Sequence, residues 1–226
     1  MAKTTDEDQD TINRLLESAQ DVFAEEGFRD ARIQDICERA DANIASVNYH
    51  FGSKEDLYSQ AWRKAFEESL EKYPPNGDVP DDAPAEERLR GRIRSLIERI
   101  SDPDHQDFLF AHKEMANPTP LGGKVLKECI QPLVNGTIDL LRELLGPDVS
   151  EQTVEYCERS IVSQCLHLLH LQRKEEMIAE SDADLDPEFP TIDDVDSYAD
   201  HVYRFSLAGI RSIREQTYSQ HISNDS

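Results

Sequence analysis

Hydrogen-bonding side chains gather in one short segment of the chain, and no catalytic pattern accompanies them. Asn43, Ser46 and Asn48 offer amide and hydroxyl groups, and Lys54 offers an ammonium. Such groups contact the base edges and phosphates of nucleic acids. The chain contains no G-x-S-x-G nucleophile turn, no phosphate-binding glycine loop and no Rossmann glycine pattern. The sequence therefore predicts a binding protein and not an enzyme.

A second group of residues could in principle hold a metal ion. Cys165, His167, His170 and His201 all have ligand chemistry, and His167 and His170 are three positions apart on an expected helix. A metal site needs further ligands in fixed geometry, whereas polar side chains in a ligand cavity or a dimer seam need none. The second interpretation is favoured, so we expect no metal and no cofactor.

Two short helices joined by a tight turn are predicted around the hydrogen-bonding segment. In the first, Ile33, Ile36 and Cys37 fall three and four apart, which gives one apolar face. Asn43 is a good N-cap for a second helix from Ile44 to Phe51. Two helices with so short a connection form a helix-turn-helix, which places its second helix in the DNA major groove.

Helical periodicity continues through most of the remaining chain, without period-two alternation or internal repeats. The stretch 73–85 contains four prolines and one glycine, which predicts a linker. No run of about 20 apolar residues and no apolar leader segment are present, so we expect a cytoplasmic protein without a membrane span. Cys37, Cys129, Cys157 and Cys165 lie inside helical patterns, which predicts free thiols.

Charge is the main argument against DNA binding. The chain has a net charge of −23, and residues 10–60 contain five Lys or Arg against eleven Asp or Glu. A basic surface is the usual mark of a DNA-binding domain. However, residues 42–53 contain no acid, so they could present a neutral surface to DNA. We expect modest non-specific affinity and strong inhibition by salt, unless the acidic, Lys-poor composition reflects a saline host.

Three motifs then resemble the TetR/AcrR family of transcriptional regulators. They are AxxxFAEEGF (Ala19 to Phe28), IxDICERA (Ile33 to Ala40) and NYHFGSKEDLY (Asn48 to Tyr58). The resemblance implies an all-α fold, with an N-terminal three-helix DNA-binding domain and a C-terminal helical domain for ligand binding and dimerisation. We expect a disordered acidic tail over 1–10, the DNA-binding domain over 11–58 and the second domain over 59–222.

The resemblance also implies a mechanism and a set of DNA-contacting residues. A homodimer would bind a palindromic double-stranded operator and leave it when a small-molecule effector binds, most often as a repressor. Recognition-helix residues would contact bases, and Lys54 and Arg32 would contact the phosphate backbone. The implied DNA-binding residues are Arg32, Asn43, Ile44, Ala45, Ser46, Asn48, Tyr49, His50 and Lys54.

Residues for the effector and for dimerisation are expected in the C-terminal region. The candidate pocket lining is Phe108, Phe110, His112, Met115 and His167, although such aromatics and Met are more often core. Two helices carry apolar seams at spacings of three and four, which suit either an intramolecular core or a four-helix dimer interface. With the resemblance, the second is favoured for Val154, Cys157, Ile161, Cys165, Leu168, Val195, Tyr198, Val202, Phe205 and Gly209.

A different class of function remains open. The negative charge of the helix-turn-helix region would also suit a helical dimeric adaptor or ligand-binding protein that has lost DNA binding. Binding to the DNA beside its own gene, across a salt series, distinguishes the two.

Overall fold

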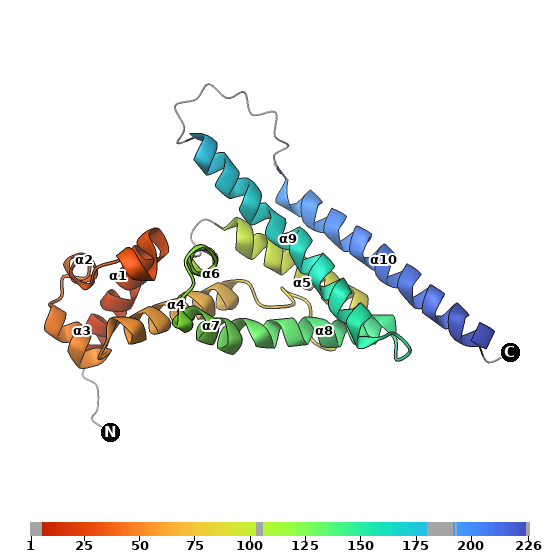
Figure 1. Ribbon diagram of the computed structural model, residues 1–226, viewed down its shortest axis with the longest axis horizontal. Coiled ribbons are helices and arrows are strands. Elements are labelled where there is room, and N and C mark those ends of the chain that lie inside the picture. Colours follow the sequence, from red (N-terminus) through yellow and green to blue (C-terminus); the bar gives the residue numbers. More distant parts are fainter. Residues whose placement is uncertain (1–5, 103–105, 180–191, 193, 225–226) are drawn as a thin grey trace. The chain divides into compact units, whose positions relative to one another are not determined.

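Every regular element within the described residues is helical, as predicted (Figure 1). The computed structural model describes residues 6–102, 106–179, 192 and 194–224. The elements are α1 Asp6–Asp30, α2 Ile33–Arg39, α3 Ile44–His50, α4 Lys54–Lys72, α5 Ala85–Ser101, α6 Asp107–Ala116, α7 Pro120–Val125, η1 Leu126–Ile130, α8 Gln131–Leu145, α9 Glu151–Ala179 and α10 Val195–Asn224. None of these helices combines the length and the apolarity that crossing a bilayer requires.

The chain divides into two compact units, and the first is discontinuous in sequence. Unit 1 comprises residues 1–72 and 104–131, and unit 2 comprises residues 73–103 and 132–226. One division falls where the predicted linker begins. The expected boundary after residue 58 does not coincide with an edge of either unit, because α4, α6 and α7 belong with the helix-turn-helix.

Unit 1 is built around aromatic side chains from α1, α4 and α6. The Tyr58 ring lies 5.0 Å from Phe23 and 5.5 Å from Phe110, and Trp62 stacks on Phe110 at 5.6 Å. All four of these side chains are buried. Large rings bury much apolar area at low entropic cost, so this cluster dominates the stability of the unit.

Helix α1 begins earlier than the sequence indicates. Residues 6–10, expected to be part of a disordered tail, form its first turns, and residues 1–5 lie outside the described residues. Acids in a first turn favour helix formation because they interact with the helix dipole, and Asp6, Glu7 and Asp8 supply them. Helical geometry is broken at Gly27, whose φ of 80° suits glycine.

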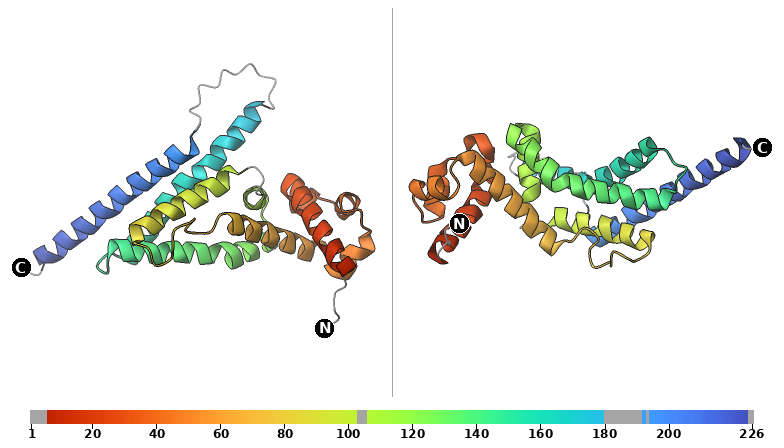
Figure 2. Two further views of the ribbon diagram at one scale, coloured as in Figure 1. Left: turned by 180° about the vertical axis from the view of Figure 1, so that it is seen from behind. Right: turned by 90° about the horizontal axis from the view of Figure 1, so that it is seen from below.

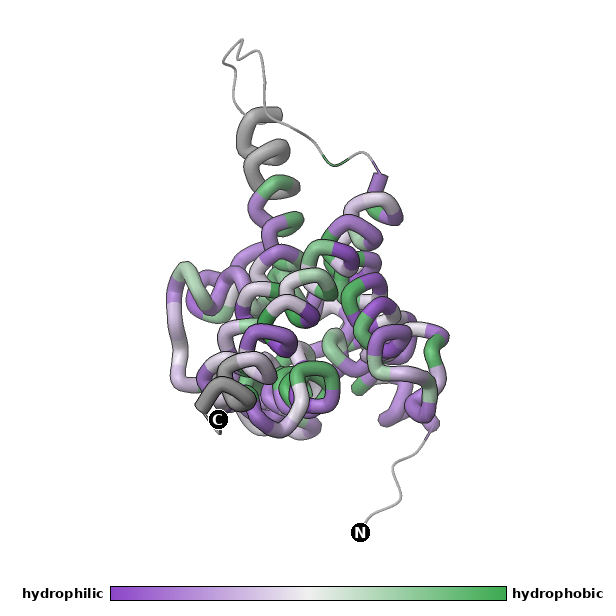
Figure 3. Tube along the Cα trace, turned by 90° about the vertical axis from the view of Figure 1, so that its right-hand side faces the viewer, coloured by the Kyte–Doolittle hydropathy of each residue, from purple (hydrophilic) through white to green (hydrophobic). Residues whose placement is uncertain are grey.

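Unit 2 contains α5, α8, α9 and α10, with α9 and α10 lying side by side (Figure 2). Its core is aliphatic and includes Leu89, Ile97 and Leu141, all buried. Hydrophobic and hydrophilic residues both occur along the same helices, as is usual for amphipathic helices (Figure 3). Arginines of α5 pair with acids of α10, with 2.7 Å between Arg94 and Asp196.

A π-helical turn, η1, joins α7 to α8. Pro132 follows it and has no N–H to donate to a carbonyl in the preceding turn. Prolines and π-helical turns are both recognised causes of a bend in a helix. Within unit 1, Glu128 of η1 accepts from Arg63 of α4 at 2.6 Å, which fixes the turn against that helix.

Candidate nucleic-acid interface

The connection between α2 and α3 is held in a conformation that few residues adopt. Asp41 has a φ of 47°, a left-handed conformation that Asp tolerates better than most residues. Arg14 of α1 donates to the carbonyl of Ala40 at 2.7 Å and to that of Asp41 at 3.3 Å. These bonds satisfy carbonyls at the end of α2 and fix the direction in which α3 leaves the turn.

Helix α3 is capped as its sequence predicts. The Asn43 side chain accepts from the backbone N–H of Ser46 at 3.0 Å and from its hydroxyl at 3.3 Å. Within α3, Val47 is buried and joins the unit 1 core. Val47 is the one buried residue of α3, and its other side chains are exposed or half-buried.

The exposed face of α3 carries most of the predicted DNA-contacting residues. Tyr49 is 79% exposed and Ile44 is 51% exposed. Exposed side chains on the same helix and just before it are Asn43, Ala45 and Asn48, whereas Ser46 and His50 are half-buried. Arg32, at the start of α2, is also exposed. This face combines an amide, small apolar groups and a phenol, which are groups able to meet base edges and phosphates.

Lys54 occupies the first position of α4, where backbone N–H groups are free of intrahelical partners. The Ser53 hydroxyl accepts from the backbone N–H of Asp56 at 3.1 Å, and so caps the helix. The Lys54 ammonium lies 4.8 Å from the centre of the Phe28 ring and 3.5 Å from the Arg29 carbonyl oxygen. It is therefore a half-buried cation beside a helix N-terminus, an arrangement that suits a phosphate group.

The predicted effector residues are divided between the two units. Phe108, Phe110, His112 and Met115 lie on α6 in unit 1, whereas His167 lies on α9 in unit 2. Phe110 is completely buried against Trp62 and is a core residue, while Met115 is 69% exposed. Aromatic packing within unit 1 occupies the Phe110 side chain, and its role in a ligand pocket stays a prediction.

The predicted dimer seam is mostly intramolecular core. Buried within the single chain are Val154, Cys157, Ile161, Cys165, Leu168 and Val202. Val195 and Tyr198 are half-buried, and the Tyr198 hydroxyl donates to the Gln164 carbonyl at 2.7 Å. A second copy cannot contact side chains that α5, α9 and α10 already cover. These six side chains are therefore packed within the single chain, whereas Phe205 and Gly209 are exposed.

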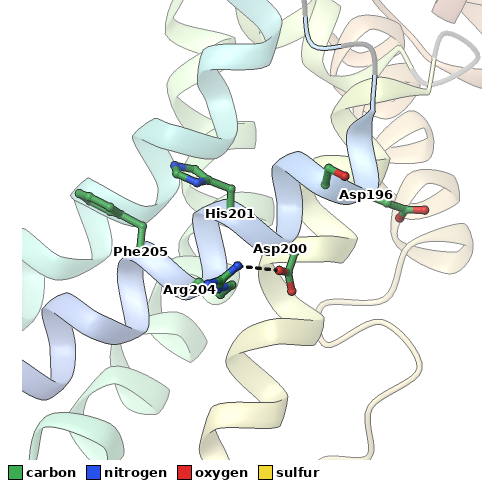
Figure 4. A pocket seen from close by; sticks show the side chains of 6 residues that line it. Asp196, Asp200, His201, Arg204 and Phe205 are labelled. Atoms are coloured by element: carbon green, nitrogen blue, oxygen red, sulfur yellow. Dashed lines mark ion pairs between the residues drawn. The ribbon is translucent and has the colours of Figure 1, made fainter.

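A shallow hollow lies on the outer side of α10 (Figure 4). Asp196, Ser197, Asp200, His201, Arg204 and Phe205 line it, and all six come from that one helix. The His201 and Phe205 rings stack at 6.2 Å, and Arg204 pairs loosely with Asp200 at 4.0 Å. A surface supplied by a single helix cannot enclose a small molecule, so this hollow is not an effector cavity.

The cysteines and histidines form no cluster that could hold a metal ion in the described ranges. No group of three or more His, Cys, Asp or Glu there converges on a common point. All four cysteines are free thiols, and burial raises the pKa of Cys165 to about 12. A thiol with so high a pKa is protonated at neutral pH and a poor nucleophile.

Sequence reasoning missed a buried polar network in unit 1. Glu114 of α6 accepts from the Tyr58 hydroxyl at 2.9 Å, and from the Thr119 hydroxyl and backbone N–H, each at 2.8 Å. Burial raises the pKa of Tyr58, and the bond to Glu114 adds to the shift. A Cβ at Gly122 would clash with the Glu114 side chain, so a larger residue there would displace this carboxylate. Tyr58 and Glu114 are 56 positions apart, so no local pattern could reveal their contact.

The comparisons with known proteins agree with this geometry. Residues 15–61 match the family model described as bacterial regulatory proteins, tetR family, and residues 85–210 match the C-terminal domain of the HTH-type transcriptional dual regulator CecR. A CecR of Shigella flexneri is 25% identical over 163 residues, which cover 68% of this chain and 73% of that protein.

Solved structures share the fold. A TetR-like transcriptional regulator from Rhodococcus sp. RHA1 has a TM-score of 0.61 at 18% identity, covering 89% of this chain and 96% of that one. FadR from Bacillus subtilis, solved in complex with stearoyl-CoA, has a TM-score of 0.65 at 15% identity, covering 87% and 98%. With its helix-turn-helix and its CecR-type C-terminal region, the chain belongs to the TetR family of DNA-binding transcriptional regulators.

Proposed function

We propose that this chain acts as a dimeric repressor that binds a two-fold symmetric operator and is released by a small molecule. The observation that carries the proposal is the outward face of α3, with Tyr49 and Ile44 exposed and Lys54 at the adjoining helix N-terminus. In a helix-turn-helix dimer the two recognition helices lie about 34–36 Å apart, one turn of DNA.

Each part of the α3 face has a distinct role in this proposal. The Asn48 amide pairs with adenine in the major groove, and Ile44 and Ala45 contact thymine methyl groups. Lys54 and Arg32 contact phosphates and set the position of the helix. Because few polar groups on α3 can read bases, DNA shape contributes part of the specificity.

The second copy docks on the outer sides of α9 and α10, not on the buried seam. Tyr156 on α9 is 54% exposed, and Phe205 on α10 is 64% exposed. Gly209 has no atom within 4 Å of the position that a Cβ would occupy, so another helix can approach closely there. A Phe205→Glu substitution should shift the chain toward monomer in sedimentation, because two carboxylates would meet across the symmetric contact.

The effector binds in unit 2, among α5, α8, α9 and α10. The complex of Bacillus subtilis FadR with stearoyl-CoA supports a ligand site in proteins of this fold, although its identity to this chain is low. Four of the five residues first considered for the pocket belong to unit 1. The proposed effector site therefore comprises residues of unit 2 other than His167, which is exposed.

Fluorescence polarisation with duplex DNA from upstream of the chain's own gene tests the proposal. Lys54→Ala should weaken binding to all sequences, whereas Asn48→Ala should relax preference at one base pair by about 1–3 kcal/mol. Lys64→Ala is the matched control, because Lys64 is paired with Glu68 at 2.7 Å and lies farther along α4. Equal effects of Lys54→Ala and Lys64→Ala would contradict the proposed phosphate contact.

One observation favours a second candidate function. Exposed carboxylates of Asp30, Asp41 and Glu55 lie close in sequence to the α3 face, where a DNA-binding surface is usually basic. An adaptor that no longer binds DNA would have such a surface. The absence of any sequence-preferring complex at low salt, from a chain that is folded and dimeric, would favour the adaptor.

A further inference from the structure

One arginine of unit 2 has hydrogen bonds but no carboxylate partner. The Arg92 Nε–H and an Nη2–H of the same guanidinium donate to the Asn76 side-chain oxygen, at 3.1 Å and 2.8 Å. An Nη1–H donates to the Thr137 hydroxyl oxygen at 3.1 Å. A guanidinium has five N–H groups, so two of the five bond to no described residue.

The other arginines around it on α5 do have such partners. Arg88, Arg90 and Arg94 each pair with a carboxylate of α8 or α10. Arg92 forms no ion pair with any described residue, although the chain contains 47 acids against 24 Lys and Arg. Its side chain is half-buried, and a charge removed from water is unfavourable unless an opposite charge accompanies it. The Arg92 guanidinium therefore lacks a counter-ion.

The Asn76 amide separates this guanidinium from a nearby acid. Its oxygen accepts from Arg92, and its nitrogen donates to the Asp81 carboxylate at 2.7 Å. Burial lowers the pKa of Arg92, repulsion from Arg88 lowers it further, and attraction from Asp81 acts in the opposite direction. Because Asp81 is exposed, water screens its attraction for the guanidinium. Three bonds to neutral groups thus hold the 73–84 stretch and α8 to Arg92, but they do not neutralise its charge.

Residues of α8 also position the guanidinium. The Thr137 hydroxyl donates to the Leu133 carbonyl at 2.9 Å, so its oxygen is left as an acceptor for Arg92. A Cβ at Gly136 would lie 3.1 Å from Arg92 Nη1, so the absence of a side chain there lets the guanidinium lie against the helix. The planar donor group is therefore held in one orientation before a ligand arrives, which reduces the entropic cost of binding.

We propose, on the basis of the proposed function, that Arg92 binds an anionic group of the effector, either a carboxylate or a phosphate. The remaining N–H groups of the guanidinium donate to oxygens of that group, and the anion supplies the counter-charge that the protein does not provide. A neutral or cationic molecule of the same shape gains neither of these interactions.

Nuclear magnetic resonance of the 15N-labelled full chain tests the proposal directly. The Nε–H signal of Arg92 is identified by its loss in Arg92→Lys. Benzoate and phenyl phosphate share one ring and carry the two candidate groups, and benzyl alcohol is the neutral probe. Each is added to about 20 mM at constant ionic strength, because fragments of this size bind weakly. At least one anion should shift the Arg92 signal in a saturable way, and the tighter-binding anion identifies the group. No saturable shift with either anion, or an equal shift with benzyl alcohol, would overturn the inference.

A pair of charge-removing variants locates the effect. Arg92→Gln keeps an amide donor but no charge, and should weaken binding of the tighter anion at least about tenfold, as followed by the rise in melting temperature. Arg90→Gln makes the same charge change on an exposed arginine of α5 and should bind the anion like the unmodified chain. Circular dichroism checks that both variants fold. If Arg92→Gln does not fold, Arg92→Lys takes its place, because it keeps the charge but loses the planar fork. An affinity equal to that of Arg90→Gln would overturn the inference.

Failure of the anion site and failure of the proposed function give different results. An absence of anion binding at Arg92, in a chain that forms a sequence-preferring complex with its upstream duplex, would overturn the inference alone. Binding that depends on Arg92, in a chain that forms no such complex at low salt, would overturn the proposed function and with it the role of the anion as effector.

Discussion

The helices within unit 1 are held together by different interactions from the helices within unit 2. In unit 1, a cluster of aromatic rings and a buried carboxylate with three neutral donors connect α4, α6 and the start of α7. In unit 2, aliphatic side chains form the core, and Arg90 and Arg94 of α5 pair with acids of α10 at its exposed border. The arginines of this acidic chain therefore neutralise acids between helices of unit 2, and few remain free near α3.

The largest test of this difference concerns Phe110. Phe110→Ala should reduce the free energy of unfolding by about 3–5 kcal/mol, because it removes a completely buried ring from the aromatic cluster. Urea unfolding followed by Trp62 fluorescence measures the change. Met115→Ala, on the same helix but exposed, should change stability by no more than about 0.5 kcal/mol. A small change in the free energy of unfolding for Phe110→Ala would mean that the ring contributes little to the core, and would leave a role in ligand binding as its better explanation.

The next effect concerns the buried carboxylate. Tyr58→Phe keeps the ring but removes one of the three donors to Glu114, and should cost about 1–3 kcal/mol of unfolding free energy. Thermal denaturation checks the value. Tyr49→Phe is the matched control, since its hydroxyl belongs to an exposed side chain and its loss should leave stability unchanged. Equal melting temperatures for both variants would show that the hydrogen bond between Tyr58 and Glu114 does not stabilise the contact between α4 and α6.

A smaller effect separates folding from recognition on α3. Asn43→Ala should cost about 1 kcal/mol of stability, because it removes the side-chain cap that accepts from Ser46. Asn48→Ala, in the same helix, should leave stability within about 0.5 kcal/mol and act on DNA preference instead. Chemical unfolding and polarisation on the same samples measure both quantities. A stability loss confined to Asn48→Ala would contradict the assigned roles.

The smallest effect is expected at the border of unit 2. Arg94→Gln breaks the ion pair that joins α5 to α10, and should cost between about 0 and 0.5 kcal/mol at low salt. Screening should abolish this cost near 1 M KCl. Arg159→Gln breaks a pair within α9 alone and provides the control. A cost above about 1 kcal/mol for Arg94→Gln would mean that the border pairs, and not the aliphatic core, hold these helices together.

Local signals in the sequence were sufficient for the helix-turn-helix. The Asn43 cap, the positive φ at Asp41 and the break in α1 at Gly27 all follow from residue type and spacing. The face of α3 that turns outward follows from Val47 being its one buried position. These features depend on neighbours a few residues away, which is why periodicity and capping rules predict them.

Features that depend on distant partners were not predictable in the same way. The apolar stripe through Val154 and Ile161 identifies a buried face, but periodicity does not say whether the same chain or a second copy covers it. Phe110 lies 52 positions from Tyr58, its partner in the aromatic cluster, so nothing near it in sequence marks it as part of unit 1. The bond from Arg14 to the Ala40 carbonyl likewise crosses from one helix to another.

The discontinuity of unit 1 has a consequence for dissecting or recombining this regulator. A fragment cut after residue 72 would lack Phe110, Glu114 and Thr119, and would leave Trp62 and Tyr58 facing water. Such a fragment should aggregate or melt at low temperature. A chimera that joins the helix-turn-helix to another ligand-binding domain must therefore contain both segments of unit 1, residues 1–72 and residues 104–131. A substitution in one segment affects the packing of the other.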